Sequence, residues 1–322
     1  MAAYDVINGY DPLRTIARGG FTFSYQMRIP AGASVATALP LYFWLHQSGK
    51  FEDDFANAAA AMTSYRADAF GVRTDAGEVD GFVVFFAIPT NSLAAKLAAY
   101  TIHRAIVEAE QARGFNIDTR QINACGYSTG AIMMKHLWYR DPSLWNACAG
   151  VDGSFNSPDL TDNASNSIYA TLPAGIALAN PAYVPNTVSP IPDTVLFAEV
   201  AGRLLTTNIA WMETTSNRPE FDATDWGRRL NDYSPLITAL NAASPGVARE
   251  SVANSSTTMD VLTTDRFFLR EMNDLDHGSI ANVPFNATHW PAIRAWFNAR
   301  ALPAPSAVGP TARGRRLSGM LL

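Results

Sequence analysis

The chain has 322 residues and a formal net charge of −5, with 48% hydrophobic and 16% charged residues. This composition supplies ample material for a folded core, and an acidic chain lacks the basic footprint of a general nucleic-acid-binding protein. No apolar run reaches the roughly 18–20 residues that a membrane-spanning helix needs, so we expect neither a nucleic-acid nor a membrane partner.

The first half of the chain alternates strand and helix patterns. Period-two alternation over residues 21–29 (FTFSYQMRI) predicts a half-buried strand, antiparallel at a sheet edge. Continuous apolar runs predict strands buried on both faces at 40–46, 81–89, 121–127 and 145–151. Helices are expected at 53–69, which begins with acidic residues, at 93–113, which stops before Gly114, and at 129–139. The alternation predicts an α/β fold with a mostly parallel central sheet flanked by helices.

The second half is less regular. Residues 152–192 are polar and contain six prolines, which we interpret as a lid-like loop insertion over the site. Strands are predicted at 194–200, 207–214 and 266–272, and helices at 222–232 and 290–299. Without an internal repeat or a linker, we expect one domain over residues 1–302. The Pro-, Gly- and Arg-rich residues 303–322 predict a flexible tail.

Cys125 and Cys148 are the only cysteines, too few for a zinc cluster or a disulfide framework. Both lie in apolar runs, which favours small buried residues over a disulfide or a reactive pair. The sequence contains no H-E-x-x-H, Walker or dinucleotide-binding motif. We therefore expect no metal and no cofactor.

Residues 126–130 read G-Y-S-T-G, which is the pattern G-x-S-x-G. The pattern ends a predicted buried strand and begins a predicted helix. A sharp strand-to-helix turn lifts the serine hydroxyl clear of the sheet, and glycines on either side let the turn close. This context predicts Ser128 as a nucleophile, with the amide of Thr129 directed toward an oxyanion.

A second oxyanion donor is expected after an earlier buried strand, where residues 45–49 read L-H-Q-S-G. We assign this donor to the amide of Gln47, with that of Ser48 as the alternative. His46 is interpreted as a structural residue of the turn rather than as the catalytic base.

The base should follow the last strand, after the nucleophile in sequence. His277 lies shortly after the predicted strand 266–272 and precedes a glycine, so we assign the base to His277, with His289 as the rival. His103 and His136 lie in predicted helices and are expected to be packing or surface residues.

The triad acid is less clearly marked, because neither of the strands predicted at 194–200 and 207–214 is directly followed by Asp. Asp222 follows the second of them at a short distance and is our assignment. Asp225, Glu213 and Glu199 are alternatives, and Asp152 would serve if the acid lies one strand earlier.

Residues from about 20 to 300 resemble an α/β-hydrolase of the polyhydroxybutyrate depolymerase and feruloyl esterase type. The resemblance rests on PLYFWLHQSGKFEDDF, RQINACGYSTGAIMMKHLWYRDPSLWNACAGVDG and the DLDHG segment. It implies a serine–histidine–aspartate triad and carries the serine and histidine to Ser128 and His277. The chain lacks the G-x-x-D pattern that carries the acid in that family. It is most similar to bacterial poly(aspartic acid) hydrolases, which are secreted or periplasmic and cut β-amide bonds.

These features predict a serine hydrolase that forms an acyl-enzyme on Ser128 and depolymerises poly(aspartic acid). An anionic polymer is compatible with a chain in which 21 of 24 basic residues are arginine, since arginine binds carboxylates through a planar fork. The alternatives are a polyhydroxyalkanoate depolymerase or general carboxylesterase, and an inactive hydrolase fold used for binding. We expect an acyl substrate as partner, with a homodimer possible, and a secreted or periplasmic mature form, with a cytoplasmic location as the alternative.

Overall fold

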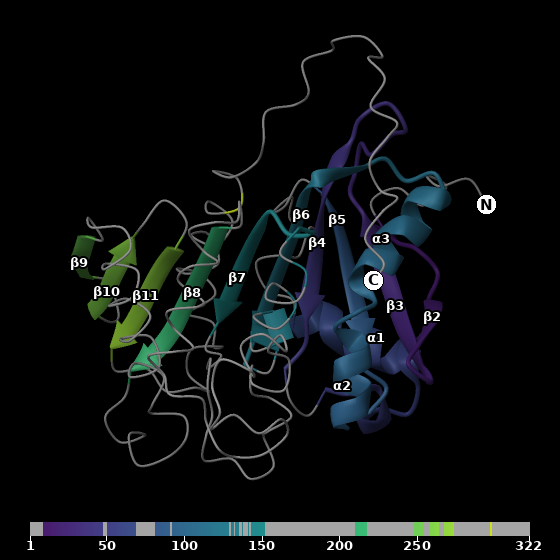
Figure 1. Cartoon of the computed structure of the whole chain (residues 1–322), viewed down its shortest axis with the longest axis horizontal. Coiled ribbons are helices and arrows are strands. Elements are labelled where there is room, and N and C mark those ends of the chain that lie inside the picture. Colours follow the sequence, from purple (N-terminus) through teal and green to yellow (C-terminus); the bar gives the residue numbers. More distant parts are fainter. Residues whose placement is uncertain are drawn as a thin grey trace, which may run out of the picture.

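The computed structural model describes residues 9–47, 50–68, 81–90, 92–128, 130–131, 133–134, 137, 141, 143–151, 210–217, 248–253, 258–263, 267–273 and 297. The described strands form one sheet in the order β1-β3-β5-β4-β6-β7-β8-β11-β10-β9, with β2 also paired to β3 (Figure 1). The strands are β1 (Gly9–Tyr10), β2 (Arg14–Arg18), β3 (Phe21–Ile29), β4 (Leu39–Leu45), β5 (Phe82–Ala87), β6 (Ile117–Tyr127), β7 (Ala147–Val151), β8 (Ala210–Asn217), β9 (Ala248–Ala253), β10 (Thr258–Thr263) and β11 (Phe267–Asn273). The described helices are η1 (Glu52–Asp54), α1 (Ala58–Asp68), α2 (Leu93–Ala99) and α3 (His103–Ala112).

The centre of the sheet is parallel, as predicted. Strands β5, β4, β6, β7, β8 and β11 pair in parallel with one another in this order. At one end β3 pairs antiparallel with β5, and at the other β10 pairs antiparallel with β11 and with β9. The prediction that β3 is an edge strand is wrong, because β1 and β2 pair with its outer side. Strands β1, β2, β9 and β10 were not predicted.

Both faces of the central strands are covered, which explains their continuous apolar sequence. Successive residues of a strand point to opposite faces. Phe43 of β4 contacts His103 of α3 at 4.8 Å between ring centroids, while its neighbour Tyr42 contacts Phe297 at 5.4 Å. Phe297 is the one described residue of the helix predicted at 290–299, and it is helical. In Figure 1, α2 and α3 lie over the part of the sheet formed by β3, β5 and β4.

Two predicted helices differ from the observed ones for local reasons. The acidic residues 52–54 form a short 3-10 turn, since the amides of Glu52 and Asp53 donate to the carbonyls of Ile88 and Pro89 after β5. The α-helix therefore begins at Ala58.

The helix expected over residues 93–113 is divided into α2 and α3. At the break, the backbone amide and the side-chain hydroxyl of Thr101 both donate to the carbonyl of Ala98. A hydroxyl that bonds the preceding turn competes with the regular i→i−4 pattern, and the chain takes a tighter turn between the two helices. The second helix ends before Gly114, which has φ of 97°.

The two cysteines lie on opposite faces of the sheet. Cys148 of β7 pairs with Ala124 of β6, whereas Cys125 pairs with Ala149. Paired residues share a face and adjacent residues do not, so the sulfurs cannot meet. Both cysteines are buried and neither forms a disulfide, and burial raises the pKa of the Cys148 thiol. This confirms the expectation of small buried residues rather than a disulfide.

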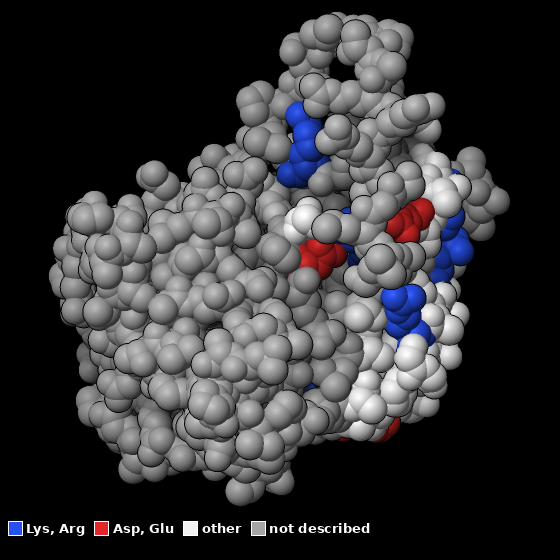
Figure 2. Space-filling view, in the orientation of Figure 1, with Lys and Arg blue, Asp and Glu red and all other residues white. Residues whose placement is uncertain are grey.

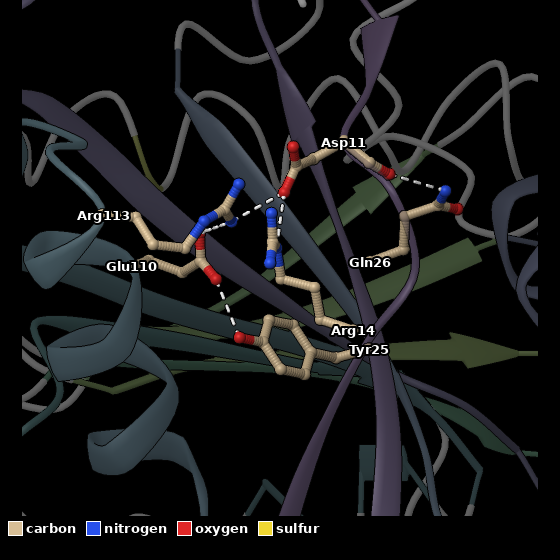
Figure 3. A network of polar contacts seen from close by, with 6 residues as sticks. All are labelled: Asp11, Arg14, Tyr25, Gln26, Glu110 and Arg113. Carbon is tan, nitrogen blue, oxygen red and sulfur yellow. Dashed lines mark hydrogen bonds and ion pairs between the residues drawn. The ribbon is translucent and has the colours of Figure 1, made fainter. Parts of the chain in front are cut away.

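A buried polar network fastens the N-terminal strands to α3 (Figure 3). Its members are Asp11, Arg14, Tyr25, Gln26, Glu110 and Arg113. Asp11 pairs with Arg113 at 2.6 Å, Arg113 also pairs with Glu110, and the hydroxyl of Tyr25 donates to Glu110 at 2.8 Å. Burial raises the pKa of Glu110 and of the Tyr25 hydroxyl. The two buried acids thus have hydrogen-bonding partners from three elements.

On the face seen in Figure 2, the described acidic and basic side chains are interspersed rather than gathered by sign. Elsewhere in the described part of the chain, the guanidinium of Arg104 donates to both carboxylate oxygens of Asp141 at 2.7–2.9 Å. No helix among the described residues is long and apolar enough to cross a membrane. The lid-like insertion 152–192, the tail 303–322, the strand at 194–200 and the helix at 222–232 lie outside the described residues.

Candidate active site

Ser128 lies directly after β6, in a left-handed backbone conformation. Its φ is 55°, and among the described residues it is the one non-glycine with positive φ. Its amide donates to the carbonyl of Val151 at the end of β7 (2.8 Å), and the first described helical residue after it is Gly130. A left-handed serine costs of order 1–2 kcal/mol, and such strain is found at functional sites. The strand–turn–helix context predicted for G-x-S-x-G is present.

The two glycines of the motif are required by close backbone approaches. A Cβ on Gly126 would lie 2.5 Å from the carbonyl carbon of Gly130. A Cβ on Gly130 would lie 2.1 Å from the carbonyl oxygen of Leu45 and 2.9 Å from that of His46. The first approach closes the turn around Ser128. The second packs the start of the following helix against the end of β4.

This second approach brings the two expected parts of the oxyanion hole together. Gln47 follows β4 by two residues and is half-buried, and its segment contacts the helix start at Gly130. The amides of Thr129 and Ser48 belong to residues outside the described set. The described backbone thus places the turn after β4 beside the turn after β6, where amides from both could face one oxyanion.

His46 is buried behind this turn and is not placed to act as a base. Its ring stacks on Tyr65 of α1 at 4.9 Å with an interplanar angle of 4°, and it meets Phe51 edge-on at 5.3 Å. Its Nδ1 lies 2.9 Å from the carbonyl oxygen of Gln47. Burial lowers the pKa of His46 from 6.5 to about 4, while the Gln47 carbonyl opposes this shift. The ring is a neutral structural group of the turn, as expected from the sequence.

His103 is likewise a packing residue. It is 1% exposed and lies at 4.8 Å from Phe43 and from Phe86, with Trp145 at 5.6 Å. The carbonyl of Ala99 lies near the ring, but no hydrogen bond of good geometry joins it or any other described residue to either ring nitrogen. Burial lowers the pKa of His103 to about 3, while the Ala99 carbonyl opposes this shift. This confirms the expectation for His103.

Lys96 of α2 was not singled out in the sequence, yet it is 2% exposed and lies beside this turn. Its Nζ is 5.4 Å from the centroid of the Phe51 ring, and burial lowers its pKa to about 8. One signal was available: the chain has three lysines among 24 basic residues, and this one stands in the apolar helix LAAKLAA.

A pocket of about 380 Å³ lies elsewhere, between the start of α3 and residues 137–145, and it is lined by Tyr100, Thr101, His103, Arg104, Leu137, Asp141, Leu144 and Trp145. Neither Ser128 nor Gln47 lines it. Within the described part of the chain, no group of three or more His, Cys, Asp or Glu side chains could hold a metal.

Solved structures with a similar fold include esterases and a protein classed with the peptidases. An esterase from Rhizomucor miehei has a TM-score of 0.53 and 12% identity, over 93% of this chain and 85% of that chain. A thermostable carboxylesterase cloned from a metagenomic library has a TM-score of 0.53 and 13% identity, over 94% of this chain and 92% of that chain. A Bacteroides ovatus protein provisionally classed as a dipeptidyl aminopeptidase IV has a TM-score of 0.52 and 12% identity, and the match covers 92% of this chain but only 36% of that chain.

The chain has the α/β-hydrolase fold. No protein-family profile and no curated protein sequence matches it. In this fold the nucleophile, the acid and the base follow one another along the chain. Parallel strands end at the same edge of a sheet, and the last residues of β8 and β11, Asn217 and Asn273, are paired.

The remaining candidates can be placed only by the strands that precede them. Asp222 follows β8 by five residues and His277 follows β11 by four, so both segments leave the same edge of the sheet as Ser128. Glu213 lies inside β8, paired with Gly150 and Leu269. Asp222 and His277 themselves lie outside the described residues. The same is true of the remaining candidate acids and the remaining histidines, which are Asp152, Glu199, Asp225, His136 and His289.

Proposed function

We propose that the chain is a serine hydrolase that cleaves carboxylic esters through an acyl-enzyme on Ser128. The observation that carries the proposal is the left-handed Ser128 at the end of β6, packed through Gly130 against the turn after β4. The esterases that share the fold support an ester as substrate.

In the proposed mechanism, the hydroxyl of Ser128 attacks the substrate carbonyl and His277 takes its proton. The amides of Thr129 and of Gln47 or Ser48 stabilise the oxyanion, where one donor is typically worth about 3 kcal/mol. His277, oriented by Asp222, then protonates the leaving alcohol. Water attacks the acyl-enzyme by the same route and releases the acid.

The proposal is tested by labelling the protein with a fluorophosphonate and by hydrolysis of p-nitrophenyl butyrate. We expect the label on Ser128, and Ser128→Ala should lose both the label and more than about 10³-fold of kcat. The matched control is Ser143→Ala, because Ser143 pairs with Arg104 and Asp141 away from the turn. An unlabelled Ser128 in folded protein would contradict the proposal and favour an inactive fold used for binding.

A second candidate substrate is poly(aspartic acid), whose β-amide bonds the same chemistry would cut. It is supported by the sequence resemblance and by the excess of arginine over lysine, because arginine binds carboxylates through paired hydrogen bonds. The chain length of polyaspartate would be followed by gel filtration beside polyhydroxybutyrate and p-nitrophenyl butyrate. If the ester is hydrolysed and polyaspartate keeps its length, the protein is a carboxylesterase or a polyester depolymerase. If polyaspartate becomes shorter, the protein cleaves amide bonds of this polymer.

A further inference from the structure

The ring of His46 sits where four elements meet behind the turn that follows β4. Tyr65 of α1 stacks on it. Phe51 at the start of η1 and Phe86 of β5 meet it edge-on at 5.3 and 6.5 Å, and Nζ of Lys96 of α2 lies 5.4 Å from the centroid of the Phe51 ring. The ring is 2% exposed. Its orientation is therefore determined by packing from several sides.

The one hydrogen bond of this ring within the described part of the chain fixes its tautomer. Nδ1 lies 2.9 Å from the carbonyl oxygen of Gln47, which can only accept. Nδ1 must therefore carry the proton. The other nitrogen, Nε2, is buried without a described partner, so in the neutral ring it carries the lone pair.

The surroundings of the ring oppose a second proton. An imidazolium would bury an Nε2–H group with no acceptor among the described residues, which is unfavourable. The charges near the ring are Asp54, which favours protonation, and Lys96 and Lys50, which disfavour it. Burial is the largest effect and acts in the same direction as the two lysines.

The carbonyl that His46 holds belongs to the peptide group between Gln47 and Ser48. The preceding carbonyl, that of His46 itself, faces Gly130 at the start of the helix after Ser128. The turn thus has contacts at two successive carbonyls: the His46 ring bonds to the Gln47 carbonyl, and the helix that contains Gly130 packs against the His46 carbonyl. Both candidate donors, the amides of Gln47 and Ser48, belong to these two peptide groups.

We propose that His46 is a positioning residue that, as the neutral Nδ1–H tautomer, orients the oxyanion turn toward Ser128. The inference rests on the proposed function, since it assigns a role within the same site. His46 touches no reacting atom and acts through the Gln47 peptide. A misplacement of about 1 Å at a catalytic group can reduce the rate by about 10²-fold, so the bond matters to the chemical step.

Two substitutions separate the hydrogen bond from the packing. His46→Asn retains an amide N–H near the position of Nδ1, whereas His46→Leu retains apolar bulk without a donor. With p-nitrophenyl butyrate we expect His46→Leu to lower kcat by about 10²-fold with little change in KM, because the oxyanion donors act in the transition state. His46→Asn should recover most of this loss. Equal kcat in both variants and wild type would overturn the proposal.

A measurement on the unmutated enzyme covers the case in which His46→Leu does not fold. Nitrogen NMR of protein labelled with ¹⁵N-histidine reports the tautomer, and the His46 signals are identified by their loss in His46→Asn. We expect the Nδ1–H tautomer at pH 7, whereas an Nε2–H tautomer or an imidazolium would overturn the proposal. Inactive wild-type protein contradicts the proposed function itself. An active enzyme whose His46 carries its proton on Nε2 contradicts this inference alone.

Discussion

The ammonium group of Lys96 is held in surroundings that disfavour its charge. Burial lowers its pKa from 10.5 to about 8, so at neutral pH the folded state keeps a charge that the unfolded chain solvates better. The Phe51 ring, 5.4 Å from Nζ, compensates in part. We expect the effect of Lys96→Met, which keeps the length of the side chain, on the free energy of unfolding to be more favourable at pH 7 than at pH 10.5, by about 1–2 kcal/mol.

The pH dependence of this effect distinguishes charge from packing. A lysine with a lowered pKa destabilises the fold fully below about pH 8, and the penalty disappears as pH rises to its unfolded value near 10.5. Urea unfolding of wild type and Lys96→Met should therefore show a more favourable effect of the substitution at pH 7 than at pH 10.5. Lys50→Met is the matched control, because Lys50 is half-buried and donates to Ser64. An effect of Lys96→Met that is equal at both pH values would contradict the prediction.

At the scale of elements, the contact between the end of β4 and the helix after Ser128 should be intolerant of one added methyl. The Cβ of Gly130→Ala would lie 2.1 Å from the Leu45 carbonyl oxygen, so the turn after β4 must move away from Ser128. We expect a loss of about 10²-fold in kcat and about 1–3 kcal/mol in stability, measured by ester hydrolysis and urea unfolding.

Gly32→Ala is the control for this substitution. Gly32 has φ of 79°, and a methyl group added to its Cα would have no heavy atom within 4 Å, so the change strains the backbone without a collision. It should cost about 1 kcal/mol of stability and leave kcat unchanged. Wild-type kcat in folded Gly130→Ala would show that the contact between the two turns does not matter for turnover.

The central elements could be predicted because their sequence is shaped by burial on both faces. The runs at β4 and β5 are continuous and apolar since both sides of the sheet are covered, and the β6 strand with its serine turn is marked by glycines that sterics require. The break between α2 and α3 was missed because it depends on one hydroxyl, that of Thr101. Strands β9 and β10 (ARESVA and TMDVLT) carry little apolar periodicity.

The candidate site likewise contains parts that the local sequence predicts and parts that it does not. The strand–turn–helix context of Ser128 could be predicted from the local sequence, since the strand, the turn and the helix are adjacent there. The acid and the base come from segments after β8 and β11, where chain order alone leaves Asp222 beside Asp225 and His277 beside His289. The role proposed for His46 depends on side chains from four elements, such as Tyr65 and Phe51. These residues are distant from one another in the sequence, so no local pattern predicts that they pack together.

For the molecule as a whole, two buried neutral histidines make the fold sensitive to acid. Burial lowers the pKa of His46 to about 4 and that of His103 to about 3, against 6.5 in the unfolded chain. Their stabilising effect is complete above pH 6.5 and is lost as pH falls, because the unfolded state then binds protons that the folded state does not. Each such group lowers the free energy of unfolding by about 1.4 kcal/mol per pH unit.

One buried acid acts in the opposite direction to the two histidines. Burial raises the pKa of Glu110, so the folded state binds its proton first and gains stability on acidification. A single acid-unfolding curve therefore mixes opposing contributions. Comparison of wild type with a variant lacking one histidine isolates that histidine, provided that the substitution keeps the packing.

His103→Phe meets this condition, because His103 lies among Phe43, Phe86 and Trp145 and has no hydrogen-bond partner of good geometry among the described residues. Urea unfolding between pH 7 and 4.5 should show a variant whose stability falls less steeply than wild type, by about 1.4 kcal/mol per pH unit below pH 6. The two curves should run parallel above pH 7. Equal slopes at acidic pH would mean that His103 is protonated in the folded state, which the aromatic environment of this ring does not permit without rearrangement of the packing between α3 and β4.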